Sequence, residues 1–401
     1  MGILYNFFLT ILLPILYVGS FFNKKINKWL TSRRNQTIPK NLDGPIWIHA
    51  ASLGEFEQGR SLIEAIKKQW PSKKIALTFF SSSGYEARKN YAYADWVGYI
   101  PYDKQSNAKK FIEALDPCLA IFIKYEFWYH HLKMLDQKKI PFIFISSYWW
   151  QDHFLLKPWN KWLLKKALYA DRIFVQDEMS GSFLAQTGYE KITIAGDTRI
   201  DRVLEIKNEA FTDVKCNQLL KYKPVLVAGS TWAEDEVLLA NLLQLNNEYA
   251  LVVAPHDVSK KRIDEVMIYF KAYKPKILSH WNGDAFKVMI IDQLGLLNKL
   301  YRFASVAYVG GGFGKGIHNT LEAVVYGIPV FYGPHHKAFK EAIDFTQSGI
   351  GFSINNSQEM NAVLQKLDES TLDKIKNKST EYFEQNAGAT AKIIAYLHTQ
   401  M

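Results

Sequence analysis

Short apolar runs alternate with amphipathic segments along most of the chain. In the first half, the apolar runs predict strands at residues 46–49, 75–79, 119–123, 142–146, 173–175 and 192–195. Segments between them, such as 56–69 and 107–115, repeat their apolar residues with the spacing of a helix. Strands that alternate with helices in this way predict a parallel sheet with helices on both faces.

The same pattern restarts after a polar stretch at residues 208–223. Further strands are predicted at residues 224–228, 251–254, 288–291, 306–309 and 329–331. Two doubly wound α/β domains, joined near residues 205–222, are the simplest architecture for this pattern. Because such sheets bind ligands beyond the carboxyl ends of their strands, we expect functional residues in the loops after the strands. A ligand site is expected in a cleft between the two facing domains.

The amino terminus departs from this alternation. Residues 1–22 contain no charged side chain, and residues 23–40 contain only basic ones: Lys24, Lys25, Lys28, Arg33, Arg34 and Lys40. About 20 apolar residues suffice to cross a hydrocarbon core of about 30 Å, and a basic flank favours the cytoplasmic side. The pattern predicts a membrane-anchor helix that either spans the bilayer or lies in its interface. A buried first helix is the alternative.

Net charge adds to the membrane prediction. The 401 residues include 49 Lys and Arg against 39 Asp and Glu, a formal net charge of +10. Residues 1–210 hold 29 basic and 20 acidic residues, and residues 211–401 hold 20 and 19. The excess of +9 in the first half indicates an anionic partner there: a nucleic acid, a phospholipid surface or a phosphorylated small molecule. The 2 cysteines exclude a disulfide framework and favour a reducing compartment.

The loop after the first strand carries a candidate base. Ser52, Gly54 and Glu55 precede a predicted helix that begins near Phe56. The positive end of a helix favours the ionised form of a carboxylate. Glu55 is therefore a candidate general base that takes a proton from an alcohol. Ser52 or Glu55 acting only as a helix cap is the alternative.

Two later loops of the first half carry charged residues after apolar strands. Glu126 is a candidate for orienting an acceptor or holding a cation, with a surface pair to Lys124 as the alternative. Arg199 offers a planar guanidinium that suits a carboxylate or a phosphate. An ion pair with Asp197 or Asp201 is its equally common alternative.

In the second half, a glycine-rich segment is the most informative feature. Five of the seven residues 310–316 are glycines, and they stand between a predicted strand and a predicted helix. Backbone N–H groups in such a segment can hold an anion, and Glu322 could bind the hydroxyls of a ribose. Residues 229–231 are a second, weaker phosphate candidate. A flexible surface loop is the alternative for the glycine segment.

The segment does not follow the dinucleotide or Walker patterns, so hydride transfer and nucleotide hydrolysis lose support. The sequence also lacks the usual histidine, cysteine and paired-aspartate metal motifs, so we expect no metal and no cofactor.

These motifs together resemble a known family. They are similar to motifs of the 3-deoxy-D-manno-octulosonic acid (Kdo) transferases of lipopolysaccharide assembly. The similar segments are residues 49–55, 125–128, 229–231, 255–256, 310–311, 316–322 and 333–335. The resemblance runs in order over nearly the whole chain. It implies a metal-independent GT-B glycosyltransferase with two Rossmann-like domains that face a cleft. It also implies CMP-Kdo as donor, a lipid A precursor as acceptor, and inversion at the anomeric carbon at the cytoplasmic face of the inner membrane.

The resemblance implies that Glu55 is the general base and that Glu322 and the glycines beside it bind the CMP part of the donor. Together with the candidates from the residue pattern, the catalytic set is Glu55, Glu126 and Arg199. The donor set is Gly229, Ser230, Thr231, Pro255, His256, Gly311, Gly312, Gly316, His318, Asn319, Thr320 and Glu322. The acceptor set is Ser52, Gly54, Lys24 and Lys25. The chain departs from the family pattern at Lys124, Asp197, Arg199, Asp257 and at Gly312 or Phe313.

These assignments lead to a domain scheme. Residues 1–22 form the membrane anchor, 23–207 an acceptor-binding domain and 208–401 a donor-binding domain. The expected partners are CMP-Kdo, the lipid A precursor and inner-membrane phospholipid, without nucleic acid. Another GT-B glycosyltransferase or an epimerase that uses a UDP-sugar is the runner-up. A protein that only binds nucleic acid or membranes would not need the glycine segment.

Overall fold

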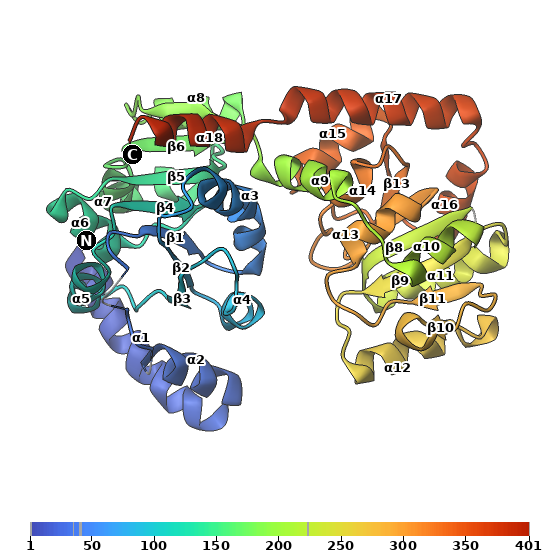
Figure 1. Ribbon diagram of the computed structural model, residues 1–401, viewed down its shortest axis with the longest axis horizontal. Helices are drawn as coiled ribbons and strands as arrows, with labels where there is room; N and C mark the ends of the chain where they lie inside the picture. Colours follow the sequence, from blue (N-terminus) through green and yellow to red (C-terminus); the bar gives the residue numbers. More distant parts are fainter. Residues whose placement is uncertain (1, 35, 40–41, 223, 401) are drawn as a thin grey trace. The chain divides into compact units, whose positions relative to one another are not determined.

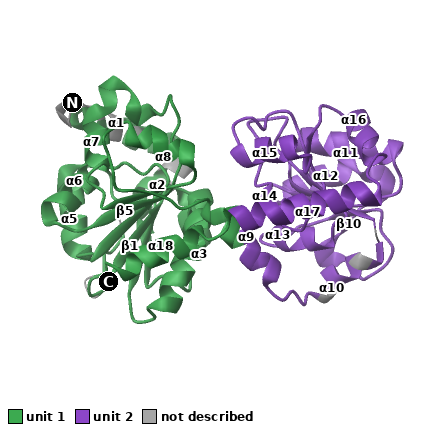
Figure 2. Cartoon of the chain, turned by 90° about the horizontal axis from the view of Figure 1, so that it is seen from above, with its two compact units in different colours: residues 1–202, 386–401 green, residues 203–385 purple. Residues whose placement is uncertain are grey.

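The computed structural model describes residues 2–34, 36–39, 42–222 and 224–400 (Figure 1). The chain forms two compact units, one of residues 1–202 and 386–401 and one of residues 203–385 (Figure 2). Each unit is built around a parallel sheet with helices, so the predicted pair of α/β domains is confirmed.

The sheet of unit 1 has seven strands in the order β3-β2-β1-β4-β5-β6-β7. Every pair of neighbours is parallel. The strands are β1 (Ile46–Ala50), β2 (Ile75–Phe79), β3 (Trp96–Tyr99), β4 (Leu119–Ile123), β5 (Phe142–Ser147), β6 (Arg172–Val175) and β7 (Ile192–Ile194). β3 lies at the sheet edge and half of it is only partly buried, which explains why no strand was predicted there.

Two apolar cores cover the two faces of this sheet. Trp47 of β1 packs into one core, and Ile46 and Ile48 pack into the other, because successive side chains of a strand point to opposite faces. The helices are α1 (Gly2–Phe22), α2 (Lys24–Arg34), α3 (Leu53–Gln69), α4 (Ser82–Arg88), α5 (Gln105–Leu115), α6 (Tyr129–Lys138), α7 (Lys161–Ala167), α8 (Glu178–Ala185), α9 (Thr198–Asn208) and α18 (Ala389–His398), with short 3-10 turns η1 (Phe154–Leu156) and η2 (Pro158–Asn160). α9 carries the chain on into unit 2.

The sheet of unit 2 also has seven parallel strands, in the order β10-β11-β9-β8-β12-β13-β14. They are β8 (Val225–Thr231), β9 (Ala250–Pro255), β10 (Lys276–Ile277), β11 (Val288–Ile290), β12 (Val306–Val309), β13 (Val330–Tyr332) and β14 (Gly351–Ser353). The two edge strands β10 and β14 were not predicted, because each is only two or three residues long and incompletely buried.

The helices of unit 2 are mostly short. They are α10 (Val214–Asn217), α11 (Ala233–Leu245), α12 (Lys260–Tyr269), α13 (Leu297–Leu300), α14 (Leu321–Val324), α15 (Lys340–Ser348), α16 (Ser357–Leu364) and α17 (Glu369–Asn386), with 3-10 turns η3 (Gln218–Tyr222), η4 (Lys271–Tyr273), η5 (Leu278–His280) and η6 (Tyr301–Phe303).

After α17 the chain returns to unit 1. Ala389, Ile393 and Leu397 of α18 are fully buried in the core that also contains residues of α3. The carboxylate of Asp201 accepts the backbone N–H groups of Gly388 and Thr390 at 2.7 and 2.6 Å. The domain scheme predicted from the sequence divides the chain once, near residue 207, and therefore does not include this return of residues 386–401 to unit 1.

The amino-terminal helix contacts the rest of unit 1 through its first turns. Within the described ranges, no helix combines the length and the apolarity that crossing a bilayer requires. α1 contains Pro14. The Tyr5 hydroxyl donates to Asp103 at 2.7 Å, and Asn6 Oδ1 lies 2.6 Å from His130 Nε2. Residues 2–22 of the predicted anchor therefore form a helix that is bonded to the rest of unit 1.

Candidate active site

The strand order of unit 1 brings the two predicted catalytic glutamates to one edge of its sheet. β1 connects onward to β2 and β3 on one side, and β4 connects onward to β5, β6 and β7 on the other (Figure 1). The gap between β1 and β4 is thus the topological switch point, where sheets of this kind bind their ligands. Glu55 follows β1 and Glu126 follows β4, so the sheet places both loops at this point.

Glu55 lies in the first turn of α3. Ser52 is the cap of this helix, and its hydroxyl oxygen accepts the N–H of Gly54 at 3.2 Å. The same hydroxyl donates to a carboxylate oxygen of Glu55. Glu55 and Ser52 are both half-buried, and Gly54 is exposed. Ser52 therefore does cap the helix, and it also bonds to the predicted base.

Glu126 lies in a more enclosed position, with 12% of its side chain exposed. The indole N–H of Trp128 donates to its Oε2 at 2.7 Å. The Nε2 of His49, a fully buried residue of β1, lies 3.1 Å from the same oxygen. The observed partners of Glu126 are thus a histidine and a tryptophan, not the Lys124 of the predicted surface pair.

Arg199 is held by Asp197. Its Nε and one terminal nitrogen lie 2.8 and 2.6 Å from Asp197 Oδ2, and its backbone N–H lies 2.9 Å from Oδ1. Burial alone would raise the pKa of Asp197, but Arg199 and Lys124 outweigh it and hold that pKa below its ordinary value. The alternative of an ion pair with Asp197 is therefore the arrangement observed, and Asp201 instead bonds to the turn before α18.

The switch point of unit 2 lies between β8 and β12. The two phosphate candidates lie at the carboxyl ends of these strands. Residues 229–231 are the last three residues of β8 and not a loop after it, whereas the glycine segment follows β12. They pack so closely that a Cβ on Gly310 would lie 2.5 Å from the carbonyl oxygen of Ser230. A Cβ on Gly312 would likewise lie 2.5 Å from the backbone nitrogen of Gly333. Glycines are needed here for close backbone approach.

Several backbone amides of the glycine segment maintain its own shape. The N–H of Gly311 donates to Asp235, those of Gly314 and Gly316 donate to Gly311, and that of His318 donates to Gly310. We expected the amides of this segment to face an anion. At these four positions the N–H groups instead donate to acceptors within the protein.

Asp235 joins the two loops of the unit 2 switch point. Its carboxylate accepts the N–H of Gly311 at 2.9 Å, the N–H of Trp232 at 2.8 Å and the hydroxyl of Tyr308 at 2.6 Å. Burial raises the pKa of Asp235, although these three hydrogen bonds oppose the rise. The local sequence does not indicate this role of Asp235, because its partner Gly311 lies 76 residues away in the chain.

Three aromatic rings stack beside the glycine segment. The rings of Trp232 and His256 lie 4.7 Å apart, and those of His256 and His318 lie 4.6 Å apart. Trp232 also donates its indole N–H to His318 Nε2 at 3.2 Å. Burial and the nearby His256 lower the pKa of His318 to about 4, so the ring is neutral and can accept this bond at neutral pH. The structure thus brings His256 and His318 together, with Thr231 bonded to the backbone of His256.

The remaining donor candidates surround the start of α14. The side-chain amide of Asn319 donates to Glu322 at 3.1 Å, and Asn319 also accepts the N–H of Leu321. Thr320 is fully buried, whereas Glu322 is half-buried. Pro255 ends β9, next to the stacked His256.

Comparison with known proteins places these features in a family. Residues 24–202 match the family model described as 3-Deoxy-D-manno-octulosonic-acid transferase (kdotransferase). The chain is 28% identical over 335 residues to the 3-deoxy-D-manno-octulosonic acid transferase of Aquifex aeolicus (strain VF5), covering 82% of this chain and 87% of the relative. It is 27% identical over 384 residues to that of Haemophilus influenzae, covering 88% and 86%. Over most of its length the chain is thus similar to the Kdo transferases. This similarity identifies it as a transferase.

Solved structures with a similar fold align with most of the chain. A putative UDP-N-acetylglucosamine 2-epimerase from Listeria monocytogenes aligns with a TM-score of 0.59 at 13% identity, over 88% of this chain and 95% of that one. A UDP-GlcNAc 2-epimerase from Neisseria meningitidis aligns with a TM-score of 0.58 at 14% identity, over 89% and 100%. At this identity the likeness concerns the fold alone, which is consistent with the GT-B type.

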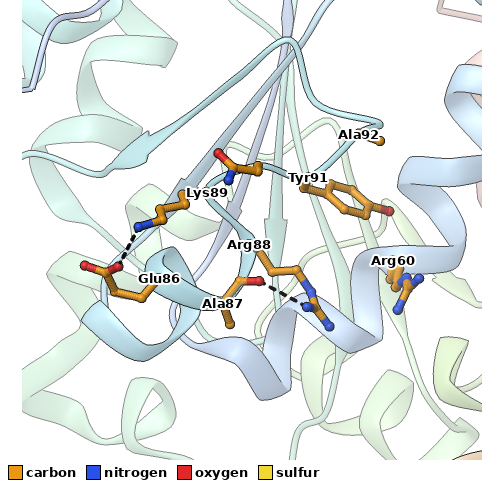
Figure 3. A pocket seen from close by; sticks show the side chains of 8 residues that line it. Arg60, Glu86, Ala87, Arg88, Lys89, Tyr91 and Ala92 are labelled. Atoms are coloured by element: carbon orange, nitrogen blue, oxygen red, sulfur yellow. Dashed lines mark hydrogen bonds and ion pairs between the residues drawn. The ribbon is translucent and has the colours of Figure 1, made fainter. Parts of the chain in front are cut away.

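A surface pocket of unit 1 is lined by residues other than the predicted ones. It is lined by Arg60 of α3 and by residues 86–92 at and after the end of α4 (Figure 3). Its cations are paired: Arg60 with Glu64 at 2.8 Å, Arg88 with Glu57 at 2.7 Å and Lys89 with Glu86 at 3.0 Å. These pairs reduce its attraction for an anionic ligand.

The predicted acceptor residues Lys24 and Lys25 lie at the start of α2. α2 gives the backbone of Lys24 and Lys25, but their side chains lie outside what the structure describes. Among the described residues, no group of three or more His, Cys, Asp or Glu side chains is arranged to hold a metal ion.

Proposed function

We propose that the protein transfers Kdo from CMP-Kdo to a hydroxyl of a lipid A precursor, with inversion at the anomeric carbon. The observation that carries this proposal is the position of Glu55, a half-buried carboxylate at the amino end of α3 and at the switch point of unit 1. The similarity to Kdo transferases supports Kdo as the transferred sugar.

In the proposed reaction, Glu55 acts as general base. The acceptor hydroxyl attacks the anomeric carbon as its proton passes to Glu55, and the bond from that carbon to the phosphate of CMP breaks. The Ser52 hydroxyl, which bonds to Glu55, fixes the direction of the carboxylate. Glu126 orients the acceptor, and Gly54 leaves room beside the base. Lys24 and Lys25 would attract the phosphates of the acceptor.

Unit 2 binds the donor in this proposal. Glu322 accepts the ribose hydroxyls, and the glycine segment with residues 229–231 surrounds the phosphate. The rigid packing of the two loops through Asp235 supports a preformed site. The neutral stack of Trp232, His256 and His318 forms one side of it. Arg199, although paired with Asp197, keeps a cation near the acidic sugar.

We also propose that α1 lies in the membrane interface at the cytoplasmic face. Phe7, Ile11, Ile15, Val18 and Phe22 follow helical spacing, and each has 47% to 88% of its surface exposed. An exposed apolar stripe next to basic residues is typical of helices that lie in the interface. Arg33 is an exception within the basic flank, since it is buried against the ring of Trp29 at 3.9 Å.

The test of the transferase proposal uses the purified full-length chain. Incubation with CMP-Kdo and a tetra-acylated lipid A precursor should give a product heavier by one or more Kdo units in the mass spectrum. Glu55→Gln should abolish turnover and leave the affinity for CMP unchanged, since the base is lost but the donor site is intact. The matched control is Glu57→Gln, which makes the same exchange at a residue paired with Arg88. Retention of more than about a tenth of the activity, about 1.4 kcal/mol in the barrier, would exclude Glu55 as the base.

The UDP-sugar alternative shares its fold with the aligned epimerases, so it needs a separate test. CMP should raise the midpoint of thermal unfolding and UDP should not, because a ligand stabilises only the state that binds it. Glu322→Ala should remove the CMP effect. Protection by UDP alone would overturn the proposal in favour of a UDP-sugar enzyme.

A further inference from the structure

The surroundings of Glu126 contain two donors that converge on one of its oxygens. Trp128 Nε1 lies 2.7 Å and His49 Nε2 lies 3.1 Å from Oε2, and the two nitrogens lie 3.1 Å apart. An indole nitrogen is only a donor, and an ionised carboxylate is only an acceptor. The indole N–H of Trp128 therefore donates, and it lies within reach of Oε2 and of His49 Nε2. In the tautomer of His49 that carries its proton on Nε2, this N–H also donates to Oε2.

A buried chain of hydrogen bonds holds the histidine in place. His49 Nδ1 lies 2.9 Å from the hydroxyl oxygen of Thr78, and that oxygen accepts the indole N–H of Trp47 at 2.8 Å. These three residues are fully buried on the neighbouring strands β1 and β2. Because buried strands are rigid, the imidazole cannot follow Glu126 if the carboxylate turns.

The tryptophan is held from the other side. Trp128 begins the turn into α6, and its ring lies 5.0 Å from that of Phe80 and 6.0 Å from that of His49. Aromatic contacts at these separations fix the ring orientation. The direction of the indole N–H is therefore fixed as well.

We propose that His49 and Trp128 are positioning residues that anchor Oε2 of Glu126 and leave Oε1 to bind the acceptor hydroxyl. This inference rests on the proposed function. A carboxylate that offers one fixed oxygen binds a hydroxyl in one orientation, and such orientation is a large part of rate enhancement. In the described part of the chain, the hydrogen bonds found for Glu126 all involve Oε2. This agrees with an anchoring role for Oε2 and a binding role for Oε1.

The test is a set of variants in the full-length protein, with kcat and KM measured for the acceptor. Trp128→Phe keeps the ring and removes one donor, so kcat/KM should fall about tenfold, as one hydrogen bond to a charged group contributes about 1.5 kcal/mol or more. His49→Leu should lower it further, and His49→Gln, whose amide can still donate, should recover most of the loss. Affinity for CMP should stay unchanged in all three.

A double-variant cycle separates positioning from a general structural effect. In an Glu126→Ala background, Trp128→Phe should have no further effect on kcat/KM, because the residue acts through Glu126. An additive loss would overturn the inference, as would unchanged activity of Trp128→Phe. The matched controls are His398→Gln and Trp70→Phe, a histidine and tryptophan in contact at 4.7 Å elsewhere in unit 1, which should behave as the unmodified chain.

The outcomes also separate this inference from the proposed function. If the unmodified chain forms no Kdo product, the proposed function fails. If it forms product and the cycle is additive, only the positioning role of His49 and Trp128 fails.

Discussion

At the scale of single residues, the two glutamates of the unit 1 switch point have different surroundings. Glu55 is half-buried at a helix end and bonds to the single hydroxyl of Ser52. Glu126 is more enclosed and bonds to two rigid N–H donors. A base must exchange its proton, whereas an orienting group must stay still. The surroundings therefore match the different roles that we propose.

A residue-scale prediction concerns His153, which is fully buried among aromatic rings. Burial lowers its pKa to about 4, from an ordinary value of 6.5. As the pH falls below about 6.5, the unfolded chain binds a proton that the folded chain refuses until about 4, so the free energy of unfolding should decrease across this window.

Urea unfolding at pH 7 and pH 5 measures this effect. His153→Phe, which fits the aromatic surroundings, should lose less stability between the two pH values than the unmodified chain. The exposed His280→Gln serves as control and should lose as much as the unmodified chain. If His153→Phe loses as much stability between pH 7 and pH 5 as the unmodified chain, His153 is not the cause of the decrease.

A second residue-scale prediction compares two glycines of the same segment. A Cβ on Gly312 would meet backbone at 2.5 Å, whereas a Cβ on Gly314 would find its nearest atom at 3.7 Å. Gly312→Ala should therefore cost about 1 to 3 kcal/mol of stability and lower CMP affinity at least about tenfold. Gly314→Ala should change stability by no more than about 0.5 kcal/mol. Urea unfolding and calorimetry with CMP measure both, and equal effects would contradict the close packing of Gly312.

At the scale of elements, α1 shows how one helix combines two surfaces. Its first turns bond to Asp103 and His130 through Tyr5 and Asn6, and its exposed stripe continues to Phe22. Polar bonds in the first turns fix the rotation of the helix about its axis. This rotation decides which apolar side chains remain exposed for the membrane.

The element-scale prediction concerns this stripe. Ile11→Glu combined with Ile15→Glu should weaken binding to vesicles with anionic phospholipid at least about tenfold, since each buried large apolar side chain contributes about 1.5 to 3 kcal/mol. Co-sedimentation with vesicles measures the loss, and CMP affinity should not change. The matched control is Ile268→Glu with Leu294→Glu, two exposed apolar residues of unit 2. Equal vesicle binding by both double variants would refute the membrane role of α1.

At the scale of the whole molecule, the return of α18 makes unit 1 discontinuous in sequence. Residues at the far end of the chain complete one of its two cores (Figure 2). Unit 1 therefore reaches its full core only after the whole of unit 2 has been synthesised. Unit 2 is a single continuous segment of the chain.

The prediction at this scale is that a core defect in α18 weakens unit 1 and not unit 2. Ile393→Ala removes a fully buried side chain and should cost about 2 to 5 kcal/mol. Hydrogen exchange should show lower protection in β1 and α3 and unchanged protection in β8 and β12. Ile268→Ala, at a residue 71% exposed in unit 2, is the control. Lower protection in both units would contradict the assignment of α18 to unit 1.

Local patterns in the sequence predicted much of the fold and of the candidate site. The long buried strands, the loop with Ser52 and Glu55, and the glycine segment were all found from neighbouring residues. These features depend on interactions between nearby positions, such as strand burial and the capping of α3, so a short stretch of sequence contains the necessary information. The short edge strands were missed because they have few buried positions.

Other features depended on contacts between distant positions. His49 and Glu126 are 77 residues apart, and Asp235 and Gly311 are 76 apart. Nothing in either neighbourhood marks these partners, because their contact exists only after the parallel sheets have formed. The sequence by itself determined the long buried strands and the positions of the charged and glycine-rich segments. The tertiary structure alone decided the strand order, the partners of Glu126 and the return of α18, because these follow from packing and hydrogen bonds between segments that the chain brings together only on folding.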